Sequence, residues 1–273
     1  LHVRSRRQRQ MCIRDRCKTY SDKFRTGLRF LKVKLIDNKL QLVFITGRDG
    51  LKEEIVKEIS QLPHVASIFM SVNTSKHQEF DELGYSKLYG ATRLELHDDK
   101  NQYLVSVKSK LPENIEMMWK QNQTIKSLVQ DSQKIISLNC GIGLLELNLD
   151  QEIVAIDEKR YQIDDAKLNA KYLKKENVTF IAGDLDSKIV TYAKKKVYDT
   201  LIIQNERYGL SDTIKDTIKI AKFKTIIYAC QSHSTLAKDL ADLEKNYKLE
   251  RIIGLDTSCH NSYLTTIVKL VRK

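Results

Sequence analysis

The sequence predicts an α/β fold, in which a doubly wound, Rossmann-like sheet of seven strands follows a smaller α+β domain. Three observations favour it. A short apolar run before Asn139 leads into the glycine pair Gly141 and Gly143, a second apolar run ends at Asp157, and a third ends at Asp184. Buried parallel strands followed by glycines or carboxylates are typical of sheets that bind ligands at their carboxyl edge.

The glycine loop lies at the centre of the larger domain, in the stretch KIISLNCGIGLLEL of residues 134–147. Glycine is needed where a Cβ atom would collide with a nucleotide-like ligand or oppose a positive φ. The apolar spacing after Gly143 predicts the start of a helix. A glycine pair alone also occurs in ordinary turns. Glu146 stands where a third glycine would complete a dinucleotide motif, which argues against that ligand.

The two carboxylates extend this pattern. Asp157 can accept hydrogen bonds from both hydroxyls of a ribose, and Asp184 can lie beside an adenine amino group. Each acid taken singly is equally well explained as the N-cap of a helix. The whole order of strand, glycine loop, helix, acid-ended strand, helix and acid-ended strand is typical of an S-adenosylmethionine site.

Composition limits the class of protein. The chain has 273 residues, of which 41% are hydrophobic and 30% charged, and no apolar run is long enough to span a bilayer. We therefore expect a soluble monomer that does not contact membranes. Its five cysteines are irregularly spaced, which predicts neither disulfides nor a metal site and favours a reducing cytoplasm. The net charge of +12 suggests a polyanionic partner.

The first 16 residues, LHVRSRRQRQMCIRDR, are interpreted as a translated sequencing adaptor and not as a basic arm or a targeting peptide. Without their six arginines and Asp15, the net charge falls from +12 to +7. We expect this segment to be disordered and the natural N-terminus to be missing.

Residues 17–111 are expected to form the α+β domain on the RNA side, and residues 112–273 the cofactor-binding domain. Alternating apolar runs around Asp37-Asn38 predict a hairpin, and an amphipathic helix is expected to stop at Pro63. The remaining elements of the first domain are expected to be a strand at 65–73 and a strand pair at 86–96 and 102–109.

The second domain is expected to open with a helix at Pro112. Its predicted strands begin near residues 134, 151, 177, 198 and 225, with helices between the later ones. A helix capped by Ser234 or Thr235 follows, and the strands 247–256 and 263–273 end the sheet as a hairpin.

Cys230 ends the fifth of these strands, and a helix begins just after it. Ligands bind at the carboxyl ends of such strands, and a helix dipole favours a thiolate. This position makes Cys230 a candidate nucleophile, although a free cysteine is more commonly a small residue of the core.

Several segments resemble one family, the RNA (uracil-5-)-methyltransferases of the TrmA/RumA type. GLRFLKVK is similar to its GLRHLVVR, ISLNCGIG to its DLYCGIG, and YACQSHSTLAKDL to its YVSCNPxTLARDL. The resemblance spans nearly all of residues 27–273. It implies a class I methyltransferase domain that uses S-adenosylmethionine, acts on ribosomal or transfer RNA, and needs no metal.

The resemblance also implies roles for individual residues. It maps the catalytic cysteine onto Cys230, which would add to C6 of a flipped-out uridine so that C5 takes the methyl group. A base would then remove the C5 proton, and elimination would free the enzyme. Arg207 would contact the RNA. The cofactor would be held by Asn139, Gly141, Gly143, Asp157, Asp184 and Gln204.

The sequence departs from the family at four places. Gln204-Asn205-Glu206-Arg207 replaces D-P-P-R, and residues 110–114 replace F-F-Q-V-N. The strand-one Asp is Ser137, and the base Glu of H-V-E-T-V aligns with Thr265, whose hydroxyl is not a base near neutral pH. A degenerate paralogue that retains RNA or cofactor binding without turnover is therefore the alternative. A methyltransferase for another substrate, with Cys230 structural, is a third possibility.

Overall fold

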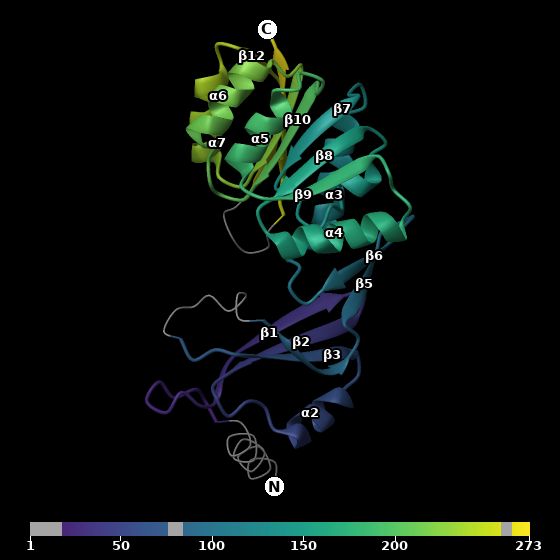
Figure 1. The fold of residues 1–273 in the computed structure, drawn as a ribbon, viewed down its shortest axis with the longest axis vertical. Helices are drawn as coiled ribbons and strands as arrows, with labels where there is room; N and C mark the ends of the chain where they lie inside the picture. The colour runs from purple at the N-terminus through teal and green to yellow at the C-terminus, as the bar shows by residue number, and fades with distance from the viewer. Residues whose placement is uncertain (1–17, 76–83, 258–263) are drawn as a thin grey trace. The chain divides into compact units, whose positions relative to one another are not determined.

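The computed structural model describes residues 18–75, 84–257 and 264–273. The chain divides into two compact units, Leu1–Lys108 and Ser109–Lys273 (Figure 1).

A four-stranded sheet of order β1-β2-β3-β4 forms the body of the first unit. The predicted hairpin is confirmed, because β1 and β2 pair antiparallel through Asp37 and Asn38, which have φ angles of 45° and 61°. Positive φ at both positions gives the turn whose twist matches the two strands. The strands are β1 (Leu28–Ile36), β2 (Lys39–Thr46), β3 (Val65–Val72) and β4 (Ser86–Gly90), with α2 (Glu53–Ser60) joining β2 to the parallel β3.

The single strand predicted at 86–96 is wrong, because it divides into β4 and β5 (Arg93–His97). Gly90 ends β4 with a φ of +77°, and a Cβ atom there would lie 2.0 Å from the carbonyl oxygen of Ala66. The chain turns at this glycine, and β5 pairs with β6 (Gln102–Ser106) in a sheet of its own.

The second unit contains a seven-stranded sheet of order β12-β13-β11-β10-β7-β8-β9, and the predicted Rossmann-like fold is confirmed. Among these seven strands, β13 alone runs in the direction opposite to the other six. The strands are β7 (Lys134–Leu138), β8 (Glu152–Asp157), β9 (Val178–Ala182), β10 (Thr200–Asn205), β11 (Thr225–Cys230), β12 (Tyr247–Leu255) and β13 (Thr265–Arg272).

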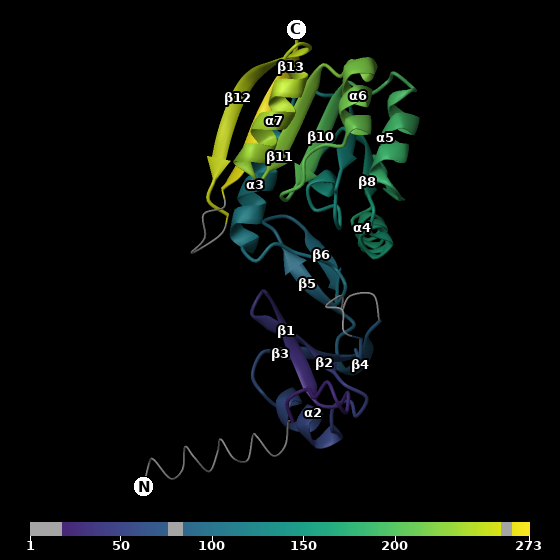
Figure 2. The ribbon, with the colours of Figure 1, turned by 90° about the vertical axis from the view of Figure 1, so that its left-hand side faces the viewer.

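Helices cover both faces of this sheet (Figures 1 and 2). One face carries α5 (Leu185–Ala193), α6 (Asp212–Ala221) and α7 (His233–Leu243), and the other carries α3 (Ile115–Leu128) and α4 (Arg160–Tyr172). The core under α5–α7 takes alternate strand residues, and in β11 these are Ile226, Tyr228 and Cys230. None of the helices in the described part of the chain is long and apolar enough to cross a membrane.

Two helices begin later or earlier than predicted because other residues cap them. Asn114 accepts a hydrogen bond from Met117 N, so α3 starts at Ile115 and not at Pro112. Ser232 accepts one from Thr235 N, so it caps α7 in place of Ser234 or Thr235.

The helix predicted after Gly143 is absent from this described segment. A single 3-10 turn, η1 (Glu146–Asn148), stands there instead. Residues 144–151 alone separate Gly143 from β8, whereas a parallel crossover through a helix needs a dozen or more residues. The β7–β8 connection therefore packs directly onto the end of the sheet, and its buried leucines are Leu144, Leu145, Leu147 and Leu149.

We predict that Gly90→Ala lowers the free energy of unfolding of the chain by about 2 kcal/mol or more, because it adds a backbone clash to an unfavourable φ. Gly84→Ala is the matched control, since Gly84 has a φ of +76° but no atom within 4 Å of its added Cβ. Urea denaturation of the two variants measures the difference. Equal losses would show that the clash with Ala66 contributes nothing.

Candidate cofactor site

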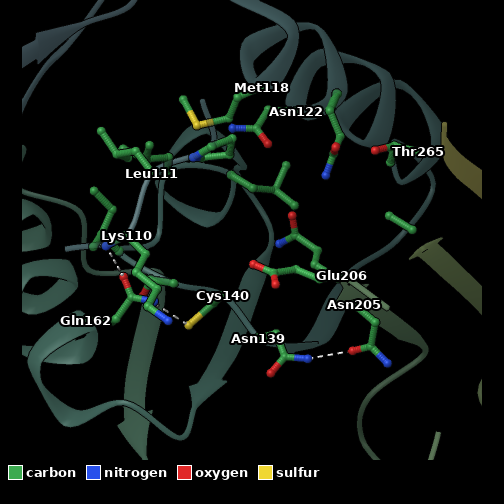
Figure 3. Close-up of a pocket in the computed structure, with 18 of the residues that line it drawn as sticks. Lys110, Leu111, Met118, Asn122, Asn139, Cys140, Gln162, Asn205, Glu206 and Thr265 are labelled. Carbon is green, nitrogen blue, oxygen red and sulfur yellow. Dashed lines mark hydrogen bonds between the residues drawn. The ribbon is translucent and has the colours of Figure 1, made fainter. Parts of the chain in front are cut away.

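The order of the sheet strands reverses between β7 and β10, since the chain proceeds from β7 to β8 and β9 and then returns to β10. Ligands of such folds bind outside the carboxyl ends of the two strands where this happens. Asn139 follows β7 and Asn205 ends β10, and Asn139 Nδ2 donates to Asn205 Oδ1 at 2.6 Å (Figure 3). This hydrogen bond links the ends of β7 and β10.

Two adjoining cavities, of about 270 and 540 Å³, open at this edge. The first is bounded further by Met118, Asn122 and Thr265, which Figure 3 shows around it, and the second by Asp157 and Asp184. The residues that line both cavities are Lys110, Asn139, Gly141, Gln162, Gln204, Asn205 and Glu206.

The two loop glycines serve different purposes. Gly141 lines both cavities, and a Cβ atom there would meet only Gln162 Nε2, at 4.0 Å, so its space is open to a ligand. Gly143 lines neither cavity, and its Cβ atom would lie 2.5 Å from Phe180 Cζ. Gly143 is thus required by its φ of +77° and by close packing, and Gly141 is the glycine that faces the cavities.

Asp157 clamps the glycine loop. Its Oδ2 accepts from Gly141 N at 2.9 Å, and its Oδ1 accepts from Lys159 N at 2.8 Å. The side chain is nearly buried, and this burial raises the pKa of the Asp157 carboxyl despite the two amide donors. A carboxylate has further lone pairs, so Asp157 retains acceptor capacity toward the second cavity.

Asp184 lines the second cavity and is also the N-cap of α5. Its Oδ1 accepts from Ser187 Oγ at 2.6 Å and from Ser187 N at 2.8 Å, and these bonds hold the pKa of Asp184 below its usual value. The two interpretations that the sequence left open for Asp184 are therefore compatible.

Glu146 is a site residue that the sequence pattern showed only as a missing glycine. Its side chain is 0% exposed, and its Oε1 accepts from Ser137 Oγ at 2.6 Å and from Gln204 Nε2 at 3.4 Å. Burial raises the pKa of the Glu146 carboxyl to about 7. An acidic residue inside the apolar run 144–149 was the signal that pointed to it.

Cys230 lies away from both cavities. Its thiol is 0% exposed, belongs to the core under α5–α7, and accepts from Ser232 N at 3.4 Å. The residues on either side of it, Ala229 and Gln231, line the first cavity. The strand tip is therefore at the site, but the Cys230 side chain points into the core.

The sequence register agrees with this placement. YACQSHSTLAKDL and the family's YVSCNPxTLARDL have the same length, so an ungapped match puts the family's cysteine at Gln231 and its serine at Cys230. The assignment of the catalytic position to Cys230 thus contains a shift of one residue. Side chains of neighbouring residues along a strand point to opposite faces, which explains why Cys230 lies in the core and Gln231 lines the first cavity.

Thr265 stands at the first cavity, where β13 begins. Its Oγ1 lies 2.8 Å from Thr257 Oγ1, and the next residue, Thr266, is the β-sheet partner of Cys230. The structure therefore brings the tips of β11 and β13 together, and the position that aligns with the family's base lies at the first cavity without a carboxylate.

Arg207 is exposed and lines neither cavity, and its carbonyl oxygen accepts from Thr235 Oγ1 at 3.3 Å. The adjacent Tyr208 is 85% exposed and borders the second cavity. Within the described ranges, no three His, Cys, Asp or Glu side chains are grouped so as to hold a metal ion.

We predict that Asp157→Asn lowers the free energy of unfolding by about 1–3 kcal/mol, because one of its two backbone donors would face an amide NH₂. Asp184→Asn, the matched control, changes it by less than about 0.5 kcal/mol, since asparagine caps helices as well as aspartate. Thermal or urea unfolding of both variants tests this. An Asp184→Asn loss as large as that of Asp157→Asn would contradict it.

No family model matches the chain. It is 28% identical over 261 residues to an uncharacterized RNA methyltransferase of Enterococcus faecalis, covering 92% of this chain and 56% of that one. It is 29% identical over 251 residues to one of Halalkalibacterium halodurans, covering 87% and 54%. The chain thus spans about half the length of the curated relatives it matches.

The fold is also that of a solved structure, the tRNA (uracil-54, C5)-methyltransferase of Pyrococcus abyssi in complex with S-adenosyl-L-homocysteine. The TM-score is 0.80 at 20% identity, over 97% of this chain and 66% of that one. The second unit therefore has the Rossmann-like fold of S-adenosylmethionine-dependent methyltransferases, and the chain is similar in sequence to bacterial RNA methyltransferases.

Proposed function

We propose that this chain binds S-adenosylmethionine in the two adjoining cavities and is part of an RNA methyltransferase or of its non-catalytic paralogue. The observation that carries the proposal is the open Gly141 at the β7–β10 edge, clamped by Asp157 and followed around the second cavity by Asp184. The Pyrococcus abyssi structure of the same fold, which contains S-adenosyl-L-homocysteine, supports it.

The donor and acceptor groups fit the two ends of such a cofactor. Asp157 and Asp184 would accept from the ribose and adenine of the adenosine end. Asn139 and Gln204, which line both cavities, would face the methionine end. The bound cofactor would supply an electrophilic methyl group on a sulfonium.

RNA is the proposed partner, on the support of the two RNA methyltransferases to which the chain is similar. Arg207 and Tyr208 would contact it, because Arg207 is an exposed cationic residue that suits a phosphate, and the exposed ring of Tyr208 borders the second cavity and suits a base.

Methylation of uracil C5 requires two further groups, a thiolate that adds to C6 and a base that removes the C5 proton. The Cys230 thiol is enclosed in the core, Gln231 occupies the family's cysteine position, and Thr265 carries only a hydroxyl. Loss of a general base alone costs about 10²–10⁴ in rate. These residues favour the non-catalytic version of the proposal over turnover through Cys230.

We predict that the full chain binds S-adenosyl-L-homocysteine with micromolar affinity in isothermal titration calorimetry. Its donors and acceptors are already arranged around the cavities, so binding requires little reorganisation. Absence of heat at millimolar ligand, with the circular dichroism of a folded protein, would contradict the cofactor assignment.

We also predict that the variant Gln231→Cys forms a covalent adduct with uridine-containing RNA that the wild-type chain does not form. The added thiol lies at the first cavity, and Thr265 offers no base to release the adduct by elimination, so adding Thr265→Glu to this variant should lower the amount of adduct. Denaturing electrophoresis with labelled RNA detects the adduct, and Cys230→Ala serves as the control. An adduct in the wild-type chain that Cys230→Ala abolishes would establish the Cys230 route instead.

A further inference from the structure

Glu146 carries a buried negative group directly behind the two cavities. It lines neither of them, but Gln204, which lines both, donates its side-chain amide to Glu146 Oε1. The second carboxyl oxygen, Oε2, is buried and has no hydrogen-bond partner in the described structure. Burial of an ionised carboxylate with one unpartnered oxygen is unfavourable in free energy unless a cation or a further hydrogen-bond donor compensates it.

The chemistry of a carboxylate decides how Gln204 is oriented. An ionised carboxylate only accepts hydrogen bonds, so the NH₂ group of Gln204 must face Glu146. The Gln204 carbonyl oxygen then remains as an acceptor for a donor in the cavities. A protonated Glu146 can donate instead, which allows the amide to turn and present its NH₂ group to the cavities.

We propose that Glu146 is a positioning residue that holds Gln204 as an acceptor for the cationic end of the bound cofactor and supplies the buried negative charge behind it. The inference rests on the proposed function and goes beyond it by naming a regulated contact. Ser137, at the family's strand-one Asp position, holds Glu146 by donating to it, so the acidic group at this end of the sheet comes from η1 and not from β7.

The groups that act on Glu146 give the direction of a pH dependence. Burial raises its pKa to about 7, the Ser137 hydrogen bond lowers it, and the nearby Asp157 carboxylate raises it. Cys140, the other titratable neighbour, has a pKa raised far above neutral by burial and by Glu146, so it stays protonated. A bound cation favours the ionised form of Glu146. Affinity therefore rises with pH through about 7 and levels off above it.

The test is calorimetric binding of S-adenosylmethionine to the full chain at pH 6, 7 and 8. Wild-type affinity is expected to fall about tenfold from pH 8 to pH 6, since about a tenth of Glu146 is ionised at pH 6. Glu146→Gln, which keeps the shape, should bind weakly and without this dependence. Asp157→Asn is the control, since it should weaken binding and keep a pH dependence, with the midpoint moved to lower pH because a charge that raises the pKa of Glu146 is lost.

Ser137→Ala provides a second test that does not require the Glu146 variant to fold. Loss of the Ser137 donor should raise the pKa of Glu146 and move the midpoint of the binding curve to higher pH. An unchanged midpoint in Ser137→Ala, or a pH dependence that persists in Glu146→Gln, would overturn the inference. Absence of wild-type binding at every pH would overturn the cofactor assignment itself and this inference with it.

Discussion

The short connection between β7 and β8 is the constraint on which the site depends. A helix in this connection would place its N-terminal amides and their partial positive charge at the cavities. Residues 144–151 leave no room for one, so the connection folds around η1 with four buried leucines. The hydrogen bond between Ser137 and Glu146 joins this connection to β7 and brings a carboxyl group into the space beneath the cavities.

The segment after β10, which lines part of the second cavity, is held in place by α6 and α7. Asp239 in α7 is nearly buried, and its Oδ2 accepts from Leu210 N and from Tyr228 Oη, each at 2.9 Å. Its Oδ1 lies 2.9 Å from Lys215 Nζ in α6. These bonds fasten the segment after β10, which borders the second cavity, to the helices and to β11. Cys230 ends the same strand as Tyr228 and shares its face, which explains why its thiol joins the core.

The alternation of apolar runs and acid-ended strands was enough to predict the Rossmann-like sheet, its closing hairpin, and the sequence positions that reach its carboxyl edge. Local sequence signals gave wrong predictions where tertiary packing determines the structure. Gly90 looked like an ordinary strand residue, because its close contact with Ala66 is a tertiary one. The spacing after Gly143 fitted a helix, but the β7–β8 connection is too short to contain one.

The chemistry at the strand tips was harder to predict because it depends on single-residue register. Cys230 and Gln231 are neighbours in sequence, yet one faces the core and the other the first cavity. Glu146 was visible only as an acid in an apolar run, and its partners Ser137 and Gln204 come from β7 and β10. Such convergence is a property of the fold and not of any one motif.

The most direct test of the account is a crystal structure of the chain with S-adenosyl-L-homocysteine bound. We expect the adenosine beside Asp157 and Asp184, the amino group of the ligand on the carbonyl oxygen of Gln204, and Glu146 still accepting the Gln204 amide from behind. Ligand density elsewhere on the chain, or a Gln204 amide turned away from Glu146 in the occupied site, would contradict it.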